Sequence, residues 1–238
     1  KFIATASHDL RQPLHAVNIY LDLFDLNKLP SKERINFLQI RKSIQTLNSM
    51  FKSLLDLSKL DAGSADKLEK PFELLELVSF LSSTYTPIAK SKNLLLHFDF
   101  LNTGINGDKL LLQQLLGNLI SNAIQYTATG SVLIRFTSNN DFLHVMIEDT
   151  GCGINSDLLD KIFDEFFRVD STRNMHDGLG LGLSIVKRLC KISNTELTVQ
   201  STLGAGTTFS LQTPYAISTL PAHIEILIDD SSQDGLGS

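Results

Sequence analysis

Two apolar stripes within residues 1–60 constrain the fold more than any other feature of this sequence. The first stripe repeats every seven residues through Ile3, Leu10, Val17 and Phe24, with Leu14 and Leu21 four residues after two of them. The second alternates steps of three and four residues through Phe37, Ile40, Ile44, Leu47, Phe51 and Leu54. Such spacing places apolar side chains on one helix face, so we expect helices over about residues 2–26 and 31–60.

The segment NKLPSK separates these two expected helices. Pro30 favours a turn and Ser31 is a suitable N-cap, so residues 1–66 should form a helical hairpin. Two helices cannot bury both stripes by themselves. We therefore expect a homodimer in which two hairpins form a four-helix bundle. The alternative is that the hairpin packs against the second domain of its own chain.

His8 falls at the outermost position of the first helix, opposite the apolar stripe. An exposed histidine is most often a solvated surface residue, but two neighbours indicate a functional site here. Asp9 can accept the Nδ1 proton of the imidazole and leave Nε2 as a nucleophile. Pro13 cannot donate to the carbonyl of Asp9, so we expect a kink at the histidine.

The rest of the chain mixes strand and helix patterns. The expected elements are a strand followed by a helix over 68–90, a strand over 94–100, a long helix over 107–127, a hairpin joined by SNND over 131–149, a helix over 181–192 and a hairpin over 195–214. Because these elements are grouped rather than strictly alternating, they predict an α+β sandwich over residues 67–215, with helices on one face of a mixed sheet.

Three amides share one face of the expected long helix, because Asn118, Asn122 and Gln125 are spaced i, i+4 and i+7. One amide alone would be an ordinary solvated side chain. An amide oxygen is also a suitable ligand for Mg²⁺, which keeps several waters and takes phosphate oxygens as further ligands.

Two glycine-containing segments indicate a nucleotide site. Asp149 ends an expected strand and is followed by Gly151 and Gly153, so its carboxylate can accept from an exocyclic amine while the glycines let a flat base approach. The segment GLGLGL, residues 178–183, runs into a helix, where backbone N–H groups and the helix dipole favour phosphate. The alternative for either segment is a structural turn.

Composition excludes some classes of partner. The net charge of −5 offers no basic field for nucleic acid. No apolar run is long enough to span a bilayer. The two cysteines lack metal-type spacing and suggest no disulfide scaffold, which is typical of a protein in a reducing cytoplasm. The chain opens with Lys1, so we expect a cytoplasmic fragment whose contact with a membrane would come only through a preceding sensor or anchor.

Six motifs together resemble those of sensor histidine kinases of two-component systems. ASHDLRQPL is similar to the H-box and GNLISNAIQYT to the N-box, while EDTGCGI, IFDEFFRVD, GLGLGLSIVKRL and GAGTTFSL resemble the G1, F, G2 and G3 boxes, in the family's order and spacing. The resemblance implies a HisKA-type dimerisation hairpin followed by an ATP-binding sandwich of the GHKL (Bergerat) type.

The resemblance also implies a function and a role for each matching position. His8 would be autophosphorylated from ATP, with Asp9 as its activating acid and Arg168 reaching the transferred phosphate. Asn122 would hold Mg²⁺, with Asn118 as a second candidate ligand. The nucleotide-binding residues would be Asn118, Asn122, Tyr126, Asp149, Gly151, Gly153, Gly178, Gly180, Leu181, Gly182 and Thr208. Residues 170–177 would form a mobile lid. The phosphoryl group would pass to an aspartate of a response-regulator receiver domain, either a separate protein or part of the same full-length chain.

Other functions remain open at this stage. Gln12 stands where many relatives carry a threonine or asparagine, and Gln125 where many carry a phosphate-contacting lysine. A nucleotide-binding dimeric signalling module, or a response-regulator phosphatase without kinase activity, is therefore an alternative. A hydrolase of the gyrase and chaperone type would need a carboxylate where Asn118 stands.

The tail, residues 216–238, admits two interpretations. The alternation of Ile224, Ile226 and Ile228 before Asp229 and Asp230 resembles the first strand and acidic pair of a receiver domain. The alternative is a frayed strand with a solvated acidic tail.

Overall fold

The computed structural model describes residues 16–17, 19–21, 23–24, 30, 32–41, 43–44, 47, 70–139, 142–169, 180–217 and 222–227. The chain divides into two compact units, one formed by residues 1–66 and 166–181 and the other by residues 67–165 and 182–238. The predicted domain boundaries at residues 66 and 215 stay predictions. Across the described residues, no helix is both long and apolar enough to cross a bilayer.

The described part of the first unit contains helical residues within 16–21 and 32–47. The rings of Phe24 and Phe37 lie 5.2 Å apart between centroids and are tilted by 49°, so the two predicted helices contact one another. Leu21 and Phe37 are buried. Other members of the two stripes remain exposed in the single chain: Val17, Phe24, Ile40 and Leu47 expose 37%, 55%, 52% and 41% of their surface.

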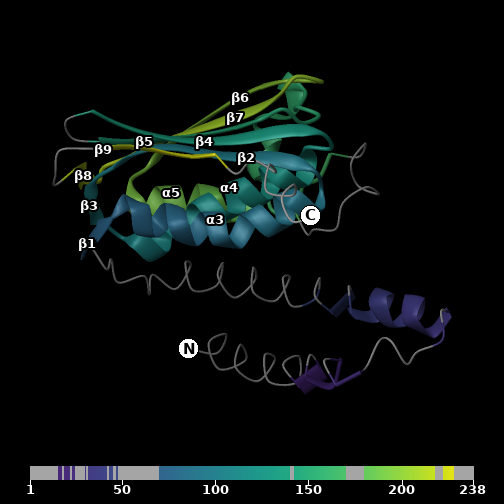
Figure 1. Ribbon diagram of the computed structural model, residues 1–238. Coiled ribbons are helices and arrows are strands. Elements are labelled where there is room, and N and C mark those ends of the chain that lie inside the picture. Colours follow the sequence, from purple (N-terminus) through teal and green to yellow (C-terminus); the bar gives the residue numbers. More distant parts are fainter. Residues whose placement is uncertain are drawn as a thin grey trace, which may run out of the picture. The chain divides into compact units, whose positions relative to one another are not determined.

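The described part of the second unit contains two sheets and three long helices (Figure 1). Its elements in chain order are β1 (Lys70–Glu73), α3 (Leu74–Ser91), β2 (Leu94–Asn102), β3 (Gly104–Gly107), α4 (Lys109–Tyr126), β4 (Gly130–Asn139), β5 (Phe142–Asp149), the 3-10 turns η2 (Ser156–Leu158) and η3 (Lys161–Phe163), α5 (Gly182–Ser193), β6 (Glu196–Thr202), β7 (Gly206–Thr213), β8 (Ala216–Ile217) and β9 (Ala222–Leu227).

The larger sheet has the strand order β6-β7-β5-β4-β2-β9, and a small sheet has the order β1-β3-β8. β2 and β4 are parallel, and the other neighbours in the larger sheet are antiparallel, so the sheet is mixed. Helices α3, α4 and α5 lie together on one face of it (Figure 1). The predicted α+β sandwich with helices on one face of a mixed sheet is therefore confirmed.

Alternation along the strands explains which face carries the helices. In β5, Leu143, Val145 and Ile147 are buried, while the residues between them are less buried. Helix α4 supplies a matching apolar face with nine buried residues. Burying this face against the sheet provides the main driving force for the unit. The polar face of α4 therefore does not pack against the sheet and can contact a ligand.

Two strands, β3 and β8, and one strand pairing, that of β9, lie outside the sequence-based expectations. β3 consists of Gly104-Ile105-Asn106-Gly107 and has neither the length nor the alternation of a recognisable strand. β8 joins β3 in the small sheet. β9 pairs antiparallel with β2, from His97 opposite Leu227 to Asn102 opposite Ala222. The tail thus has a strand partner that neither interpretation of its sequence named.

Candidate functional site

The polar face of α4 meets the start of α5. A Cβ atom placed on Gly182 would lie 3.6 Å from Oδ1 of Asn118 and 3.6 Å from both Oδ1 and Nδ2 of Asn122. Both asparagines are half-buried. Asn118 donates from Nδ2 to the carbonyl of Gln114 at 2.8 Å, which turns its Oδ1 towards Gly182. The two amides therefore converge on the first residue of α5.

This arrangement suits a phosphate with a hard cation. The first backbone N–H groups of a helix have no partner within the helix, and the helix dipole adds positive potential there. Within the described residues, no cluster of three or more His, Cys, Asp or Glu side chains could hold a metal ion. Amide oxygens such as those of Asn118 and Asn122 fit Mg²⁺ when phosphate oxygens and waters complete its coordination.

A second group of polar atoms lies at the end of β5, beside the last residue of α4. Asp149 is buried, and its Oδ1 accepts a hydrogen bond from the N–H of Gly151 at 2.8 Å. The N–H of Cys152 donates to the carbonyl of Tyr126 at 3.2 Å. These contacts hold the segment after β5 against the C-terminal end of α4. They place Asp149 and Tyr126 on the same side of the sheet as the helices.

Close backbone contacts explain the glycines of this segment. A Cβ on Gly153, whose φ is +65°, would lie 2.0 Å from the carbonyl oxygen of Thr202. A Cβ on Gly151 would lie 2.5 Å from the carbonyl oxygen of Tyr126. No other residue fits without moving backbone atoms. The structure therefore gives both predicted glycines a packing reason beside any role in admitting a base.

The electrostatics at Asp149 are unfavourable for its charge. Burial raises the pKa of this carboxyl, the N–H groups of Gly151 and Thr207 lower it by smaller amounts, and the carboxylate of Glu148 raises it. A carboxylate that is desolvated in the protein gains from a ligand that donates hydrogen bonds to it. An exocyclic amine is such a donor.

The register of the sheet shows which threonine of β7 lies beside Asp149. Asp149 pairs with Thr207, and Glu148 pairs with Thr208. Since side chains alternate along a strand, Thr207 shares the face of Asp149 and Thr208 lies on the opposite face. The structure therefore favours Thr207 over the predicted Thr208 as a neighbour of the site. Thr207 was missed because the sequence alone does not give the pairing register.

Ser201 was missed for the same reason. Its hydroxyl accepts from the N–H of Ile154 at 2.8 Å and donates to the carbonyl of Gly206 at 2.9 Å. It also lies 2.9 Å from Oγ1 of Thr207. Ser201 thus ties the segment after β5 to the β6–β7 hairpin. Only the folded sheet brings these residues together.

Of the predicted site residues that the structure describes, three belong to the other unit: Arg168, Gly180 and Leu181. Gly180, with φ +73°, lies against the backbone of the chain before it, since a Cβ there would be 2.5 Å from the carbonyl oxygen of Phe167. The two ends of the segment 168–180 are therefore close together. His8, Asp9, Gly178 and the predicted lid, residues 170–177, lie outside the described residues.

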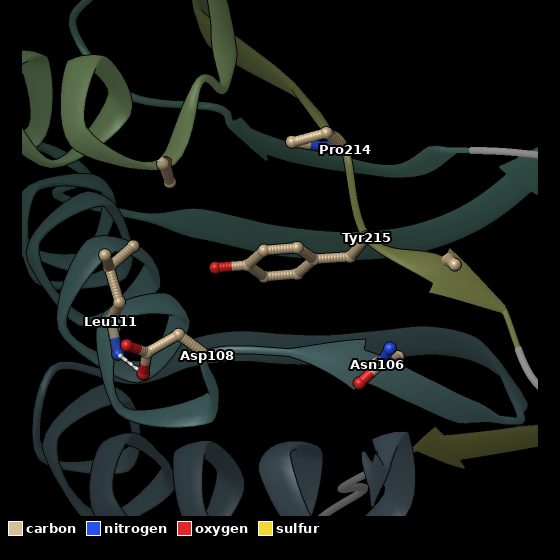
Figure 2. A pocket seen from close by; sticks show the side chains of 7 residues that line it. Asn106, Asp108, Leu111, Pro214 and Tyr215 are labelled. Carbon is tan, nitrogen blue, oxygen red and sulfur yellow. Dashed lines mark hydrogen bonds between the residues drawn. The ribbon is translucent and has the colours of Figure 1, made fainter. Parts of the chain in front are cut away.

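The opposite end of α4 holds a small pocket of about 120 Å³. Figure 2 shows Asp108, Leu111 and Tyr215 in its wall, with the Tyr215 hydroxyl directed towards the start of α4. Oδ1 of Asp108 accepts from the N–H of Leu111 at 3.0 Å and so caps the helix. This carboxylate occupies the place that an anion would take, so this end of α4 does not suit a phosphate.

Two protein-family models match the chain. Residues 1–63 match the His Kinase A (phospho-acceptor) domain. Residues 107–217 match the family described as histidine kinase-, DNA gyrase B-, and HSP90-like ATPase. The matches cover the predicted hairpin and the part of the sandwich that contains Asn118, Asn122 and Asp149.

Curated relatives agree with these matches. The chain is 31% identical over 217 residues to the sensor histidine kinase RcsC of Escherichia coli, covering 90% of this chain and 23% of that protein. It is 32% identical over 225 residues to the hybrid signal transduction histidine kinase B of Dictyostelium discoideum, covering 91% of this chain and 11% of that protein. The autoinducer 2 sensor kinase/phosphatase LuxQ of Vibrio parahaemolyticus is 32% identical over 224 residues, covering 90% of this chain and 26% of that protein. The chain thus spans about a quarter or less of the length of these relatives.

Solved structures show the same architecture. Full-length ShkA in complex with AMPPNP matches with a TM-score of 0.77 and 28% identity, covering 92% of this chain and 46% of that one. The catalytic domain of the histidine kinase ThkA matches in fold with a TM-score of 0.53 and 24% identity, covering 61% of this chain and 95% of that one.

Proposed function

The chain belongs to the sensor histidine kinases, with a His Kinase A domain and a histidine kinase-type ATPase domain, and from this we propose that it transfers the γ-phosphoryl group of ATP to His8. The observation that supports the proposal best is the convergence of Asn118 and Asn122 on the first residue of α5. It combines cation ligands with a helix N-terminus, which is what a magnesium triphosphate requires.

The reaction is an in-line displacement. Nε2 of His8 attacks the γ-phosphorus, the bond to the β,γ-bridging oxygen breaks, and ADP leaves with that electron pair. Asp9 accepts a hydrogen bond from Nδ1–H and stabilises the positive charge that develops on the imidazole. Catalysis would consist mainly of positioning and charge neutralisation. Asn122 would hold Mg²⁺, with Asn118 as a second candidate ligand, and Arg168 would contact the transferred phosphate. Asp149 would receive the adenine amine.

Transfer to His8 is favoured over steady hydrolysis. A hydrolase of this fold needs a base that takes a proton from water, and the amide of Asn118 cannot act as one. The phosphoramidate on His8 would then pass its phosphoryl group to an aspartate of a receiver domain, in a separate protein or in the same full-length chain. The relative from Dictyostelium is named a hybrid kinase, which supports the second arrangement.

The kinase would act as a homodimer. Val17, Phe24, Ile40 and Leu47 are exposed in the single chain although they belong to the two stripes. A second hairpin would cover them in a four-helix bundle. Action in the cytoplasm, without nucleic acid, stays a prediction.

Dephosphorylation of the regulator is a second candidate function. One relative, at 32% identity, is named a sensor kinase/phosphatase. Gln12 follows His8 by one turn of the predicted helix, and its side chain is long enough to orient a water molecule towards a phosphoaspartate. Loss of label from a phosphorylated receiver domain, faster with this chain than with a Gln12→Ala variant, would support this activity.

The test of the kinase is incorporation of γ-labelled phosphate from Mg-ATP into the 238-residue chain. We expect label that is stable in alkali and labile in acid. It should be absent from His8→Ala and retained in His15→Ala, which removes a histidine from the same predicted helix face. Nucleotide binding without label on the wild-type chain would overturn the proposal and leave a binding module or a phosphatase.

A further inference from the structure

The carbonyl groups at the C-terminal end of α4 need hydrogen-bond donors from outside the helix. Its last turn carries Asn122, Gln125 and Tyr126. The last carbonyl groups of a helix have no partner within the helix, and together they carry a negative partial charge. If a polyphosphate binds beside Asn122, that negative end lies close to a polyanion. Something has to satisfy these carbonyls and offset their potential.

Lys92 does both. Its Nζ donates to the carbonyl of Ile124 at 2.5 Å, to that of Gln125 at 3.0 Å and to that of Thr127 at 3.1 Å. One ammonium group thereby uses its three donors on the end of one helix. A cation in this position also interacts favourably with the helix dipole. Burial lowers the pKa of Lys92, as expected for an ammonium withdrawn from water.

The backbone of Lys92 is itself fixed. Its N–H donates to the carbonyl of Ala89 at 3.0 Å and closes α3, and Asn93 follows with a φ of +56° before β2 begins. A second contact joins the same two helices, because the hydroxyl of Tyr85 donates to the carbonyl of Gly117 at 3.1 Å. Tyr85 contacts the middle of α4, whereas Lys92 contacts its end.

The end of α4 also contacts the segment of Asp149. The carbonyl of Tyr126 accepts from Cys152 and lies so close to Gly151 that a Cβ there would be 2.5 Å away. A small displacement of the last turn of α4 would therefore move both Asn122 and the segment that follows Asp149. The interior packs too tightly for such a shift to be absorbed locally.

We propose that Lys92 is a positioning residue of the nucleotide site, which fixes the last turn of α4 and offsets its negative end so that Asn122, Tyr126 and the segment after Asp149 meet the ligand together. The inference rests on the proposed function, because it requires this site to bind a nucleotide. Lys92 itself does not contact the reacting atoms. Its effect passes through α4.

The experiment measures the Kd for Mg-ADP by calorimetry, together with the Tm, for the wild-type chain and four variants. Lys92→Met should raise the Kd by about five- to tenfold, the range expected for loss of a cation at a helix C-terminus. Lys92→Arg, which keeps the charge and several donors, should recover most of the affinity. Lys90→Met removes an exposed lysine from the last turn of α3 and should leave the Kd unchanged. Tyr85→Phe removes the other contact between the helices and should lower the Tm without changing the Kd.

The outcomes separate the possibilities. A wild-type Kd in Lys92→Met, or an equal loss of affinity in Tyr85→Phe, would overturn the inference, the latter because general anchoring of α4 would then explain the effect. Should Lys92→Met not fold, Lys92→Gln replaces it: weaker binding supports the role of the charge, and unchanged binding overturns it. Absence of Mg-ADP binding by the wild-type chain would overturn the nucleotide site and this inference with it, whereas absence of label on His8 with normal binding would overturn only the kinase.

Discussion

Helix α4 has a buried carboxylate near each end, and the two carboxylates differ in what surrounds them. Asp108 precedes the helix and caps it through the N–H of Leu111. Asp149 lies beside the last residue of the helix, in a segment shaped by glycines, and burial raises its pKa. Asp108 therefore stabilises the fold by satisfying a helix end, whereas the charge of Asp149 costs stability. Burial of an acid alone therefore does not identify a functional residue, and the desolvated charge makes Asp149 the better candidate for a ligand contact.

The same contrast separates the starts of α4 and α5. A carboxylate caps α4, whereas α5 begins with Gly182 beside two neutral amides. Where a side-chain carboxylate already accepts from the first N–H groups of a helix, an anionic ligand is not needed there. Where the helix begins with glycine beside neutral amides, these N–H groups can bind a phosphate. Substitutions at Gly182, Asp149 and Asp108 test this contrast, and their expected effects decrease in that order.

Gly182→Asp places a carboxylate at the first residue of α5, one position later than the carboxylate that caps α4. A Cβ at this position has only ordinary contacts at 3.6 Å, so the fold should tolerate the substitution. Nucleotide affinity should fall about 100-fold or more, since like charges about 4 Å apart repel by roughly 4 kcal/mol near a protein surface. The Kd for Mg-ADP, measured by calorimetry, checks this.

Gly182→Ala is the matched control, because it adds the Cβ without the charge. It should bind nucleotide more tightly than Gly182→Asp, so that the difference in Kd between the two variants measures the effect of the charge alone. Since an acid in the first turn stabilises a helix, Gly182→Asp should keep or raise the Tm. Unchanged binding by Gly182→Asp would show that the phosphate does not lie at the start of α5.

Asp149→Asn separates stability from binding at the other end of α4. Affinity should fall about ten- to 100-fold, the range for loss of a charged hydrogen-bond partner. The free energy of unfolding should stay the same or rise, because the amide oxygen can still accept from Gly151 and no charge is buried. Urea unfolding and nucleotide titration of the same sample measure the two effects.

The pH dependence of the unfolding free energy tests independently whether the charge of Asp149 destabilises the fold. The pKa of Asp149 is raised above its ordinary value of 3.8, so its contribution to stability is fully present below pH 3.8 and is lost as the pH rises through the raised pKa. The difference in unfolding free energy between Asp149→Asn and the wild type should therefore grow across that interval. If the difference in unfolding free energy did not change with pH, the charge of Asp149 would not be destabilised by burial.

Asp108→Ala should have the opposite pattern and the smallest effect. Loss of the cap should lower the free energy of unfolding by about 1 kcal/mol. The Kd for Mg-ADP should not change, because this carboxylate lies at the far end of α4. Weaker nucleotide binding in Asp108→Ala, with a normal Tm, would remove the distinction between the two ends.

Periodicity predicted most of the fold because the elements that form the sandwich carry their own patterns. Helix α4 has one apolar and one amide face, and β5 alternates cleanly. β3 was not predicted, since its four residues contain two glycines and become a strand only through pairing with β1 and β8. Pairing of β9 with β2 is likewise a long-range property that no local pattern encodes.

The candidate site was predictable to the extent that it follows spacing along one element. Asn118 and Asn122 were placed on one helix face by their i, i+4 separation, and the structure brings both to Gly182. The register that places Thr207 beside Asp149 depends on how β5 and β7 align. Lys92 reaches α4 from 32 residues away, so no local signal could have indicated it.

The pairing of β5 with β7 also sets the order in which the site can be completed during synthesis. Asp149 gains its neighbour Thr207, and Cys152 accepts from Gly204, only when the β6–β7 hairpin has been made. At about 5–20 residues per second, a ribosome needs several seconds for the roughly 60 residues between Asp149 and Thr207. The nascent chain therefore emerges with α4 and its amide face complete but without the strand β7 that pairs with the end of β5. Nucleotide binding therefore has to wait for the β6–β7 hairpin.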